Sequence, residues 1–223
     1  MADIRSVLLR ELQEGIAHRT GVTLVIGESA LERAELCRAL AEQVREDAFT
    51  AVVQDTLHSE GELLAQVLRD FGVVSRDQSR VDHRVDMAHS ELLEALERFL
   101  RGLIPIDATA LLLVDNSQGL PRPVLLRLAQ LAVLESNGLP LLQMVVMGTS
   151  ELDELLRNPE LAALDARVHR RYTLPKPVRE SEDEASMSWL RHPPTLAVAI
   201  AVVLLGCVLA VTLGIALYRR LGF

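Results

Sequence analysis

The chain has few aromatic side chains and an excess of negative charge, and both features argue against nucleic-acid binding. Only 3% of its 223 residues are aromatic, so bases would find few side chains on which to stack. The formal net charge is −8, whereas sequence-independent binding to nucleic acid depends on Lys and Arg that neutralise phosphates. We therefore expect no nucleic-acid partner, and a core built from Leu, Val, Ile and Ala.

Cysteine and histidine are also too few or too scattered to hold a metal ion. The two cysteines, Cys37 and Cys207, cannot form a disulfide framework or a metal-ligand spacing. No pair of histidines has a spacing such as H-E-x-x-H. The six are His18, His58, His83, His89, His169 and His192. We expect neither a structural zinc nor any other metal site.

Long apolar runs are absent from the N-terminus but present near the C-terminus. Residues 1–20 contain no continuous apolar stretch, so they do not resemble a signal peptide. Residues 195–217 contain no charge and are long enough to cross the hydrocarbon of a bilayer as a helix. Two prolines precede this run, and Tyr218, Arg219 and Arg220 follow it as interface residues. We predict one C-terminal transmembrane helix, with the large N-terminal domain in the cytoplasm.

Short apolar runs alternate with helix-period segments through the first 174 residues, which predicts an α/β fold with a parallel sheet. Ser59 and Glu62 form a capping box, and Gly72 ends the helix that follows. The predicted strands are 23–26, 50–54, 110–114, 141–147 and 168–174, and the predicted helices are 4–16, 31–44, 59–71, 88–102, 121–134 and 151–156. The predicted organisation is a core (1–174), an acidic and proline-containing linker (175–194), the membrane helix (195–217) and a short tail (218–223).

Residues 27–34 lie at the strand-to-helix turn where a phosphate-binding loop, G-x-x-x-x-G-K-[ST], would lie. Gly27 is kept, but Glu32, Arg33 and Ala34 replace the second glycine, the lysine and the hydroxyl. A glutamate repels phosphate, a guanidinium is broader than an ammonium, and alanine lacks the hydroxyl that holds Mg²⁺. We expect the geometry of the turn to survive and its chemistry to be lost.

Taken together, five segments carry a specific resemblance to a known family. They are 23–28 with 36–40, 59–64 with 70–72, 110–115, 141–148, and 166–174. Over residues 4–174 the chain resembles the secretion ATPases of the ExeA or GspA type, a bacterial branch of the AAA-like P-loop NTPases. The resemblance implies an ASCE/AAA-like P-loop NTPase core, with a parallel sheet flanked by helices.

The resemblance also assigns roles to residues beyond the turn. Asp115 ends the strand that corresponds to the family's Walker B motif, and Asn116 stands where the family has a catalytic glutamate. An amide cannot act as that base. Arg167 and Arg171 match the arginine-bearing end of the family's core and are candidate trans-acting arginines. A helical lid follows the core in the family, whereas here prolines lead into the linker, so we expect no lid.

Two residues have alternative interpretations. Arg33 is either a helix-start arginine paired with Glu28 or Glu32, or a contact towards a partner's nucleotide. Asp115 is interpreted as a residual carboxylate at a strand end in preference to a working metal ligand, because the hydroxyl and the base are missing.

The sequence predicts a membrane-anchored pseudo-ATPase, a non-catalytic scaffolding or interaction subunit of a secretion or envelope-associated assembly at the inner membrane. We expect no cofactor, neither ATP nor Mg²⁺. The expected partners are the membrane and other proteins, either a homologous active ATPase or an envelope secretion complex. One alternative is a divergent NTPase, active only in a mixed oligomer, to which Arg167 or Arg171 contributes an arginine finger in trans. Another is a membrane tether that recognises a peptide or a cell-wall-linked protein.

Overall fold

The computed structural model describes residues 2–54, 57–74 and 89–175, which lie in the first of two units of the chain, Met1–Lys176. No helix in these described ranges is both long and apolar enough to cross a membrane. The predicted membrane helix (195–217), the linker from residue 176 onward and the tail (218–223) lie outside the described residues, as does the segment where a lid would follow the core.

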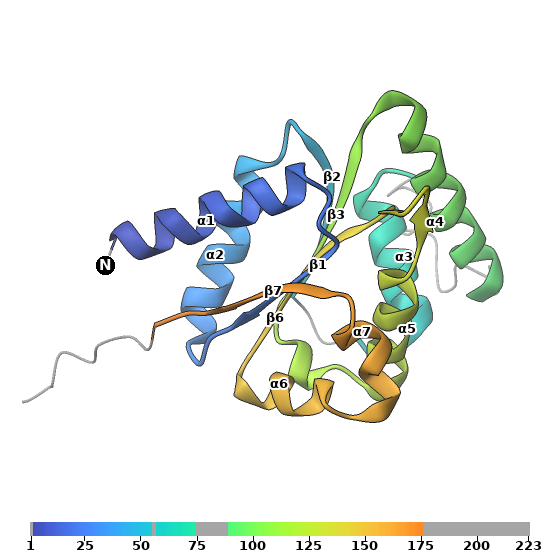
Figure 1. Ribbon diagram of the computed structural model, residues 1–223. Helices are drawn as coiled ribbons and strands as arrows, with labels where there is room; N and C mark the ends of the chain where they lie inside the picture. The colour runs from blue at the N-terminus through green and yellow to red at the C-terminus, as the bar shows by residue number, and fades with distance from the viewer. Residues whose placement is uncertain (1, 55–56, 75–88, 176–223) are drawn as a thin grey trace, which may run out of the picture. The chain divides into compact units, whose positions relative to one another are not determined.

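A five-stranded parallel sheet forms the centre of this unit, in the order β2-β3-β6-β1-β7 (Figure 1). The strands are β1 (Val22–Ile26), β2 (Ala48–Val53), β3 (Thr109–Val114), β6 (Gln143–Gly148) and β7 (Val168–Thr173). β1 lies between β6 and β7, although it comes first in the chain. The predicted α/β fold with a parallel sheet is confirmed.

Helices cover both faces of the sheet (Figure 1). α1 (Ala2–Ala17) and α2 (Ala30–Gln43) pack on one face. The larger cluster on the other face includes α3 (Glu60–Asp70), α4 (His89–Leu103), α5 (Arg122–Ala132), α6 (Ser150–Leu156) and α7 (Ala162–Asp165).

Side chains along β3 point alternately into the two apolar clusters, one on each face of the sheet. Leu111 and Leu113 face the cluster of α1 and α2, whereas Leu112 and Val114 face the other cluster. Successive side chains of a strand point to opposite faces, so a strand that is covered on both sides is apolar throughout.

The predicted capping box begins α3, with one change in its geometry. Ser59 Oγ accepts a hydrogen bond from the Glu62 amide at 3.2 Å. The Glu62 carboxylate in turn accepts from the amide of His58, at 2.7 Å, rather than from that of Ser59. Gly72, with φ of +73°, follows the helix as predicted, in a conformation that favours glycine.

Two features of the fold lie in separate regions for which the sequence pattern gives no prediction. The two-stranded hairpin β4 (Glu135–Ser136) and β5 (Leu139–Pro140) turns at Asn137 and Gly138, which both have positive φ. Asn-Gly is the strongest short hairpin signal in a sequence. α7 and the 3-10 turn before it, Pro159–Leu161, then lead into β7.

Candidate functional site

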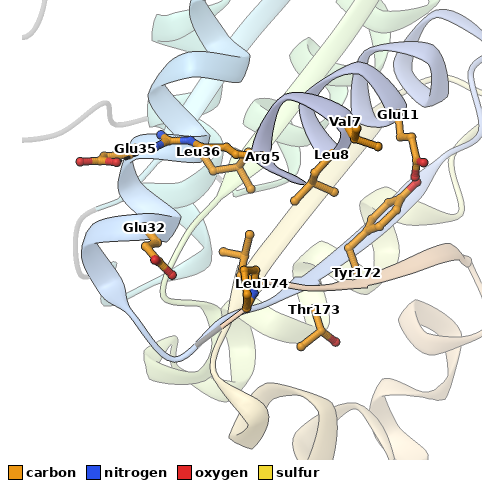
Figure 2. Close-up of a pocket in the computed structure, with 11 residues that line it drawn as sticks. Arg5, Val7, Leu8, Glu11, Glu32, Glu35, Leu36, Tyr172, Thr173 and Leu174 are labelled. Atoms are coloured by element: carbon orange, nitrogen blue, oxygen red, sulfur yellow. Dashed lines mark hydrogen bonds and ion pairs between the residues drawn. The ribbon is translucent and has the colours of Figure 1, made fainter. Parts of the chain in front are cut away.

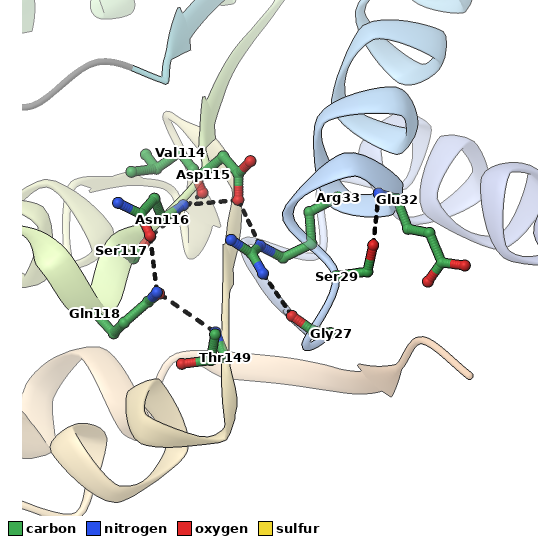
Figure 3. A network of polar contacts seen from close by, with 10 residues as sticks. All are labelled: Gly27, Ser29, Glu32, Arg33, Val114, Asp115, Asn116, Ser117, Gln118 and Thr149. Atoms are coloured by element: carbon green, nitrogen blue, oxygen red, sulfur yellow. Dashed lines mark hydrogen bonds and ion pairs between the residues drawn. The ribbon is translucent and has the colours of Figure 1, made fainter. Parts of the chain in front are cut away.

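The carboxyl ends of β1, β3 and β6 bring three turns together at one edge of the sheet (Figure 3). Gly27 follows β1, Asp115 follows β3 and Thr149 follows β6. The Gly27 amide donates to the Gly148 carbonyl at 2.9 Å, which links the first turn to the third. Ligands of open α/β sheets bind at this edge, so it is the candidate site.

The turn after β1 is short, because α2 starts three residues after Gly27. Ser29 is the N-cap, and its Oγ accepts from the Glu32 amide at 3.3 Å. The Arg33 amide donates to the Ser29 carbonyl at 3.1 Å, as in the first turn of a helix. The expected strand-to-helix turn is present between β1 and α2. It is short, because residues 30–34 are helical and do not form a loop around a phosphate.

Gly27 has a packing role that does not involve a ligand. A Cβ at this position would lie 2.7 Å from Leu174 Cδ1 and 3.0 Å from Leu174 Cβ. The Leu174 amide also donates to the Ile26 carbonyl at 2.7 Å, which fixes the chain beyond β7 against this turn. Gly27 is absent from the positive-φ glycines of the described residues. Close approach of Leu174 therefore accounts for glycine here.

Arg33 points into its own chain and is only 2% exposed. Its Nε donates to Asp115 Oδ1 at 2.8 Å, and its Nη1 donates to the Gly27 carbonyl at 2.6 Å (Figure 3). The prediction paired Arg33 with Glu28 or Glu32, and that prediction was wrong about the partner. The alternative, a contact towards a partner's nucleotide, requires an accessible guanidinium, and this one is buried.

Asp115 is the buried partner of this guanidinium. Its Oδ1 accepts from Arg33 and also from the Asn116 amide, at 2.7 Å. Both donors compensate the carboxylate for its loss of water. Burial of the neighbouring Cys37 thiol, and secondly the charge of Asp115, raise the pKa of that thiol to about 11. The geometry agrees with the interpretation of Asp115 as a strand-end carboxylate.

Asn116 begins a chain of amide hydrogen bonds across the site. It adopts the left-handed conformation, with φ of 54°, and its Oδ1 accepts from Gln118 Nε2 at 2.7 Å. Gln118 Oε1 accepts from the Thr149 amide at 3.3 Å, so the chain connects the ends of β3 and β6. A Cβ at Gly148 would lie 2.6 Å from the same Gln118 oxygen.

The sequence patterns assign no role to Gln118, Gly148 or Thr149. The available signal was their position, because all three lie just beyond the carboxyl end of a predicted buried strand. Their residue types alone indicate no particular partner.

The side chains at this corner do not fit the phosphates of a nucleotide. A phosphate site needs amides that point inward and a cation that is free to contact the ligand. Here the amides of residues 32 and 33 are bonded within the start of α2, and the guanidinium is bonded to Asp115 and Gly27. Ala34 also supplies no hydroxyl for Mg²⁺.

The two candidate trans-acting arginines lie at the end of the core, in or next to β7. Arg167 forms an ion pair with Glu135, and Arg171 forms ion pairs with Asp153 and Asp165. All of these side chains are partly exposed, so each pair contributes little to stability and can exchange. In this conformation both guanidinium groups contact carboxylates of their own chain.

Comparison with known proteins agrees with this fold. Residues 16–156 match the family AAA_22, described as AAA domain. The chain is 28% identical over 174 residues to General secretion pathway protein A of Aeromonas hydrophila. The aligned segment covers 78% of this chain and 30% of the relative. The predicted resemblance is confirmed, and the chain spans less than a third of the length of this curated relative.

Solved structures show the same core at low sequence identity. The crystal structure of Cdc6p from Pyrobaculum aerophilum has a TM-score of 0.52 at 16% identity, covering 74% of this chain and 44% of that one. A structure of Drosophila ORC bound to AT-rich DNA and Cdc6 has a TM-score of 0.54 at 13% identity, covering 76% and 28%. At these identities the comparison establishes the fold alone, an α/β P-loop NTPase-like fold.

Proposed function

The chain belongs to the AAA domain family, and from this premise we propose that it is a membrane-anchored, non-catalytic member of that family. Its role is that of an interaction or scaffolding subunit in a secretion-associated assembly at the inner membrane. Similarity to General secretion pathway protein A supports the link to secretion. The charge-free run of residues 195–217 supports the membrane anchor.

The observation that carries the proposal is the position of the Arg33 guanidinium. It bonds the end of β1 to the end of β3 through Gly27 and Asp115, where a nucleotide-binding member of the fold needs room for phosphate. The chain thus supplies its own cation and its own anion at this edge. Asn116 adds to the argument, because an amide cannot polarise an attacking water as a carboxylate does.

No contact among the described residues favours the alternative of a mixed-oligomer NTPase. An arginine finger must reach the nucleotide of a neighbour. Arg171 instead pairs with two carboxylates of its own chain, so the alternative requires that these pairs break on assembly.

The test is affinity capture of the full-length chain from detergent-solubilised membranes of its natural host, followed by ATP turnover measurements on the captured complex. We expect the chain to resist alkaline extraction and to carry a second protein in a fixed ratio. Any turnover should be unchanged by Arg171→Ala and by the matched control Arg157→Ala.

Two results would contradict the proposal. Recovery of the chain in the soluble fraction removes the membrane anchor. Loss of turnover by about a thousand-fold or more with Arg171→Ala alone supports the mixed-oligomer alternative instead, since arginine fingers have effects of that size.

A further inference from the structure

A groove lies beside the Arg33 site, between α1, the start of α2 and the end of β7 (Figure 2). Its volume is about 410 Å³, within the size range of binding pockets. The apolar part of its lining includes Val7, Leu8, Leu36, Tyr172 and Leu174.

Apolar side chains are also exposed at this groove and at the residue that precedes Glu32 in the chain. Val7, at the groove, is 37% exposed. Leu31, on the first turn of α2, is 69% exposed. Exposed apolar side chains beside a concave apolar surface are typical of an interaction site.

Acidic side chains dominate the charged part of the lining. Glu11, Glu32 and Glu35 line the groove together with Arg5, whose Nη1 lies 2.6 Å from the Glu35 carboxylate. The lining therefore contains three carboxylates and one guanidinium, and the Glu32 side chain extends towards Leu174 (Figure 2). A partner with positive charge around an apolar face complements this surface.

We propose that this groove binds a basic, amphipathic helix of a partner protein. The inference rests on the proposed interaction role and names the surface and the partner chemistry for it. Apolar side chains spaced at i, i+3, i+4 and i+7 would enter the groove, which accommodates roughly two or three of them. Lysine or arginine side chains beside that apolar stripe would face Glu11 and Glu32.

A helix fits this surface better than an added strand does. β7 is an edge strand of the sheet, but His169, Arg170 and Arg171 are exposed along it. Exposed arginines on an edge strand oppose pairing with another strand.

The chain's own C-terminal part and a nucleotide are poorer occupants. Residues 180–184 have the sequence Glu-Ser-Glu-Asp-Glu, which the acidic lining repels. The phosphates of a nucleotide meet the same repulsion from Glu32.

The experiment measures fluorescence anisotropy of a labelled synthetic peptide with the full-length chain in detergent. The peptide is an amphipathic helix of about five turns, with leucine at the anchor positions and lysine on both flanks. A second peptide, with glutamate in place of each lysine, is the control for charge.

We expect the lysine peptide to bind with micromolar affinity and the glutamate peptide to show at least about ten-fold weaker binding. The double variant Glu11→Lys/Glu32→Lys should weaken binding of the lysine peptide by at least about ten-fold. The matched control is Glu42→Lys/Glu46→Lys, which changes the net charge equally at exposed positions outside the groove. It should leave the affinity within about two-fold, because screening limits the reach of exposed charges.

Three results would overturn the inference. They are no binding of the lysine peptide at about 1 mM, equal binding of both peptides, and equal weakening by both double variants. Concentration-dependent dimers that Glu11→Lys/Glu32→Lys abolishes would replace the partner helix with a second copy of this chain. Nucleotide binding is measured in a separate experiment. A groove that binds no peptide can therefore be distinguished from a chain that does bind ATP.

Discussion

Arg33 and Asp115 are the two charged side chains buried within the described residues. Each satisfies the other, and the Gly27 carbonyl and the Asn116 amide complete their hydrogen bonds. A buried ion pair of this kind is weak evidence for stability as such, but the loss of one partner leaves an uncompensated charge. The pair therefore holds the strand ends of β1 and β3 in one arrangement.

Removal of one charge should be much more costly than removal of both. Arg33→Met leaves Asp115 buried and unpaired, and should lower the free energy of unfolding by about 3–5 kcal/mol. Arg33→Met/Asp115→Leu should lose less than the sum of the two single variants, since no buried charge is left. Urea denaturation measures the three variants.

The control for this cycle is Arg157→Met. Arg157 pairs with Asp153 at 2.8 Å, but its side chain is 73% exposed. This variant should change the free energy of unfolding by less than about 1 kcal/mol. An Arg33→Met effect no larger than that of the control would mean that the buried pair does not form.

Cys37 makes the free energy of unfolding depend on pH in the alkaline range. Burial raises the pKa of its thiol from 9.0 to about 11 in the folded chain. Between these two pH values the unfolded chain releases the thiol proton and the folded chain keeps it. The contribution of the thiol to the free energy of unfolding is therefore fully present below pH 9 and is lost as the pH rises through 11. The loss should be at most about 1.4 kcal/mol per pH unit. Denaturation curves of Cys37→Ala should lack this component, and identical pH slopes for both proteins would contradict the assignment.

At the scale of elements, the early start of α2 determines which groups are available at the end of β1. Its N-cap, Ser29, is only two residues beyond Gly27, so the amides around Arg33 are bonded within the helix. Glycine remains at position 27 because Leu174, just beyond β7, packs against it.

Gly27→Ala should therefore destabilise the fold through overpacking, by about 1–3 kcal/mol. Leu174→Ala in the same chain removes the branched end of that contact and should make the added methyl less costly. The control is Gly102→Ala on α4, where a Cβ would meet nothing within 4 Å and should be neutral or stabilise by up to about 1 kcal/mol. Chemical denaturation of these variants measures the effects. A Gly27→Ala variant as stable as the unchanged chain would contradict the packing role of Gly27.

At the scale of the whole molecule, the sequence predicted the sheet and most helices because burial has a period. All four side chains from Leu111 to Val114 are apolar, and they point alternately to the two faces of the sheet. Such a continuous apolar run is the pattern of a strand that is covered on both faces. The approximate ends of α3 were predictable because Ser59, Glu62 and Gly72 each have a local role.

The contacts of the candidate site were less predictable, because they join distant parts of the chain. Arg33 and Asp115 are 82 positions apart, and nearby glutamates in the sequence offered a simpler partner for the arginine. The link from Gln118 to Thr149 depends on two strand ends that become neighbours only when the sheet forms. Local sequence patterns carry no information on contacts between residues that are far apart in the chain.

The most direct test of the account is isothermal titration calorimetry of the full-length chain in detergent with ATP and Mg²⁺. An active AAA ATPase in the same buffer serves as the positive control. Because Arg33 is bonded to Asp115 and Gly27, the account predicts no binding with a Kd below about 1 mM. A saturable heat of binding with a micromolar Kd would contradict it.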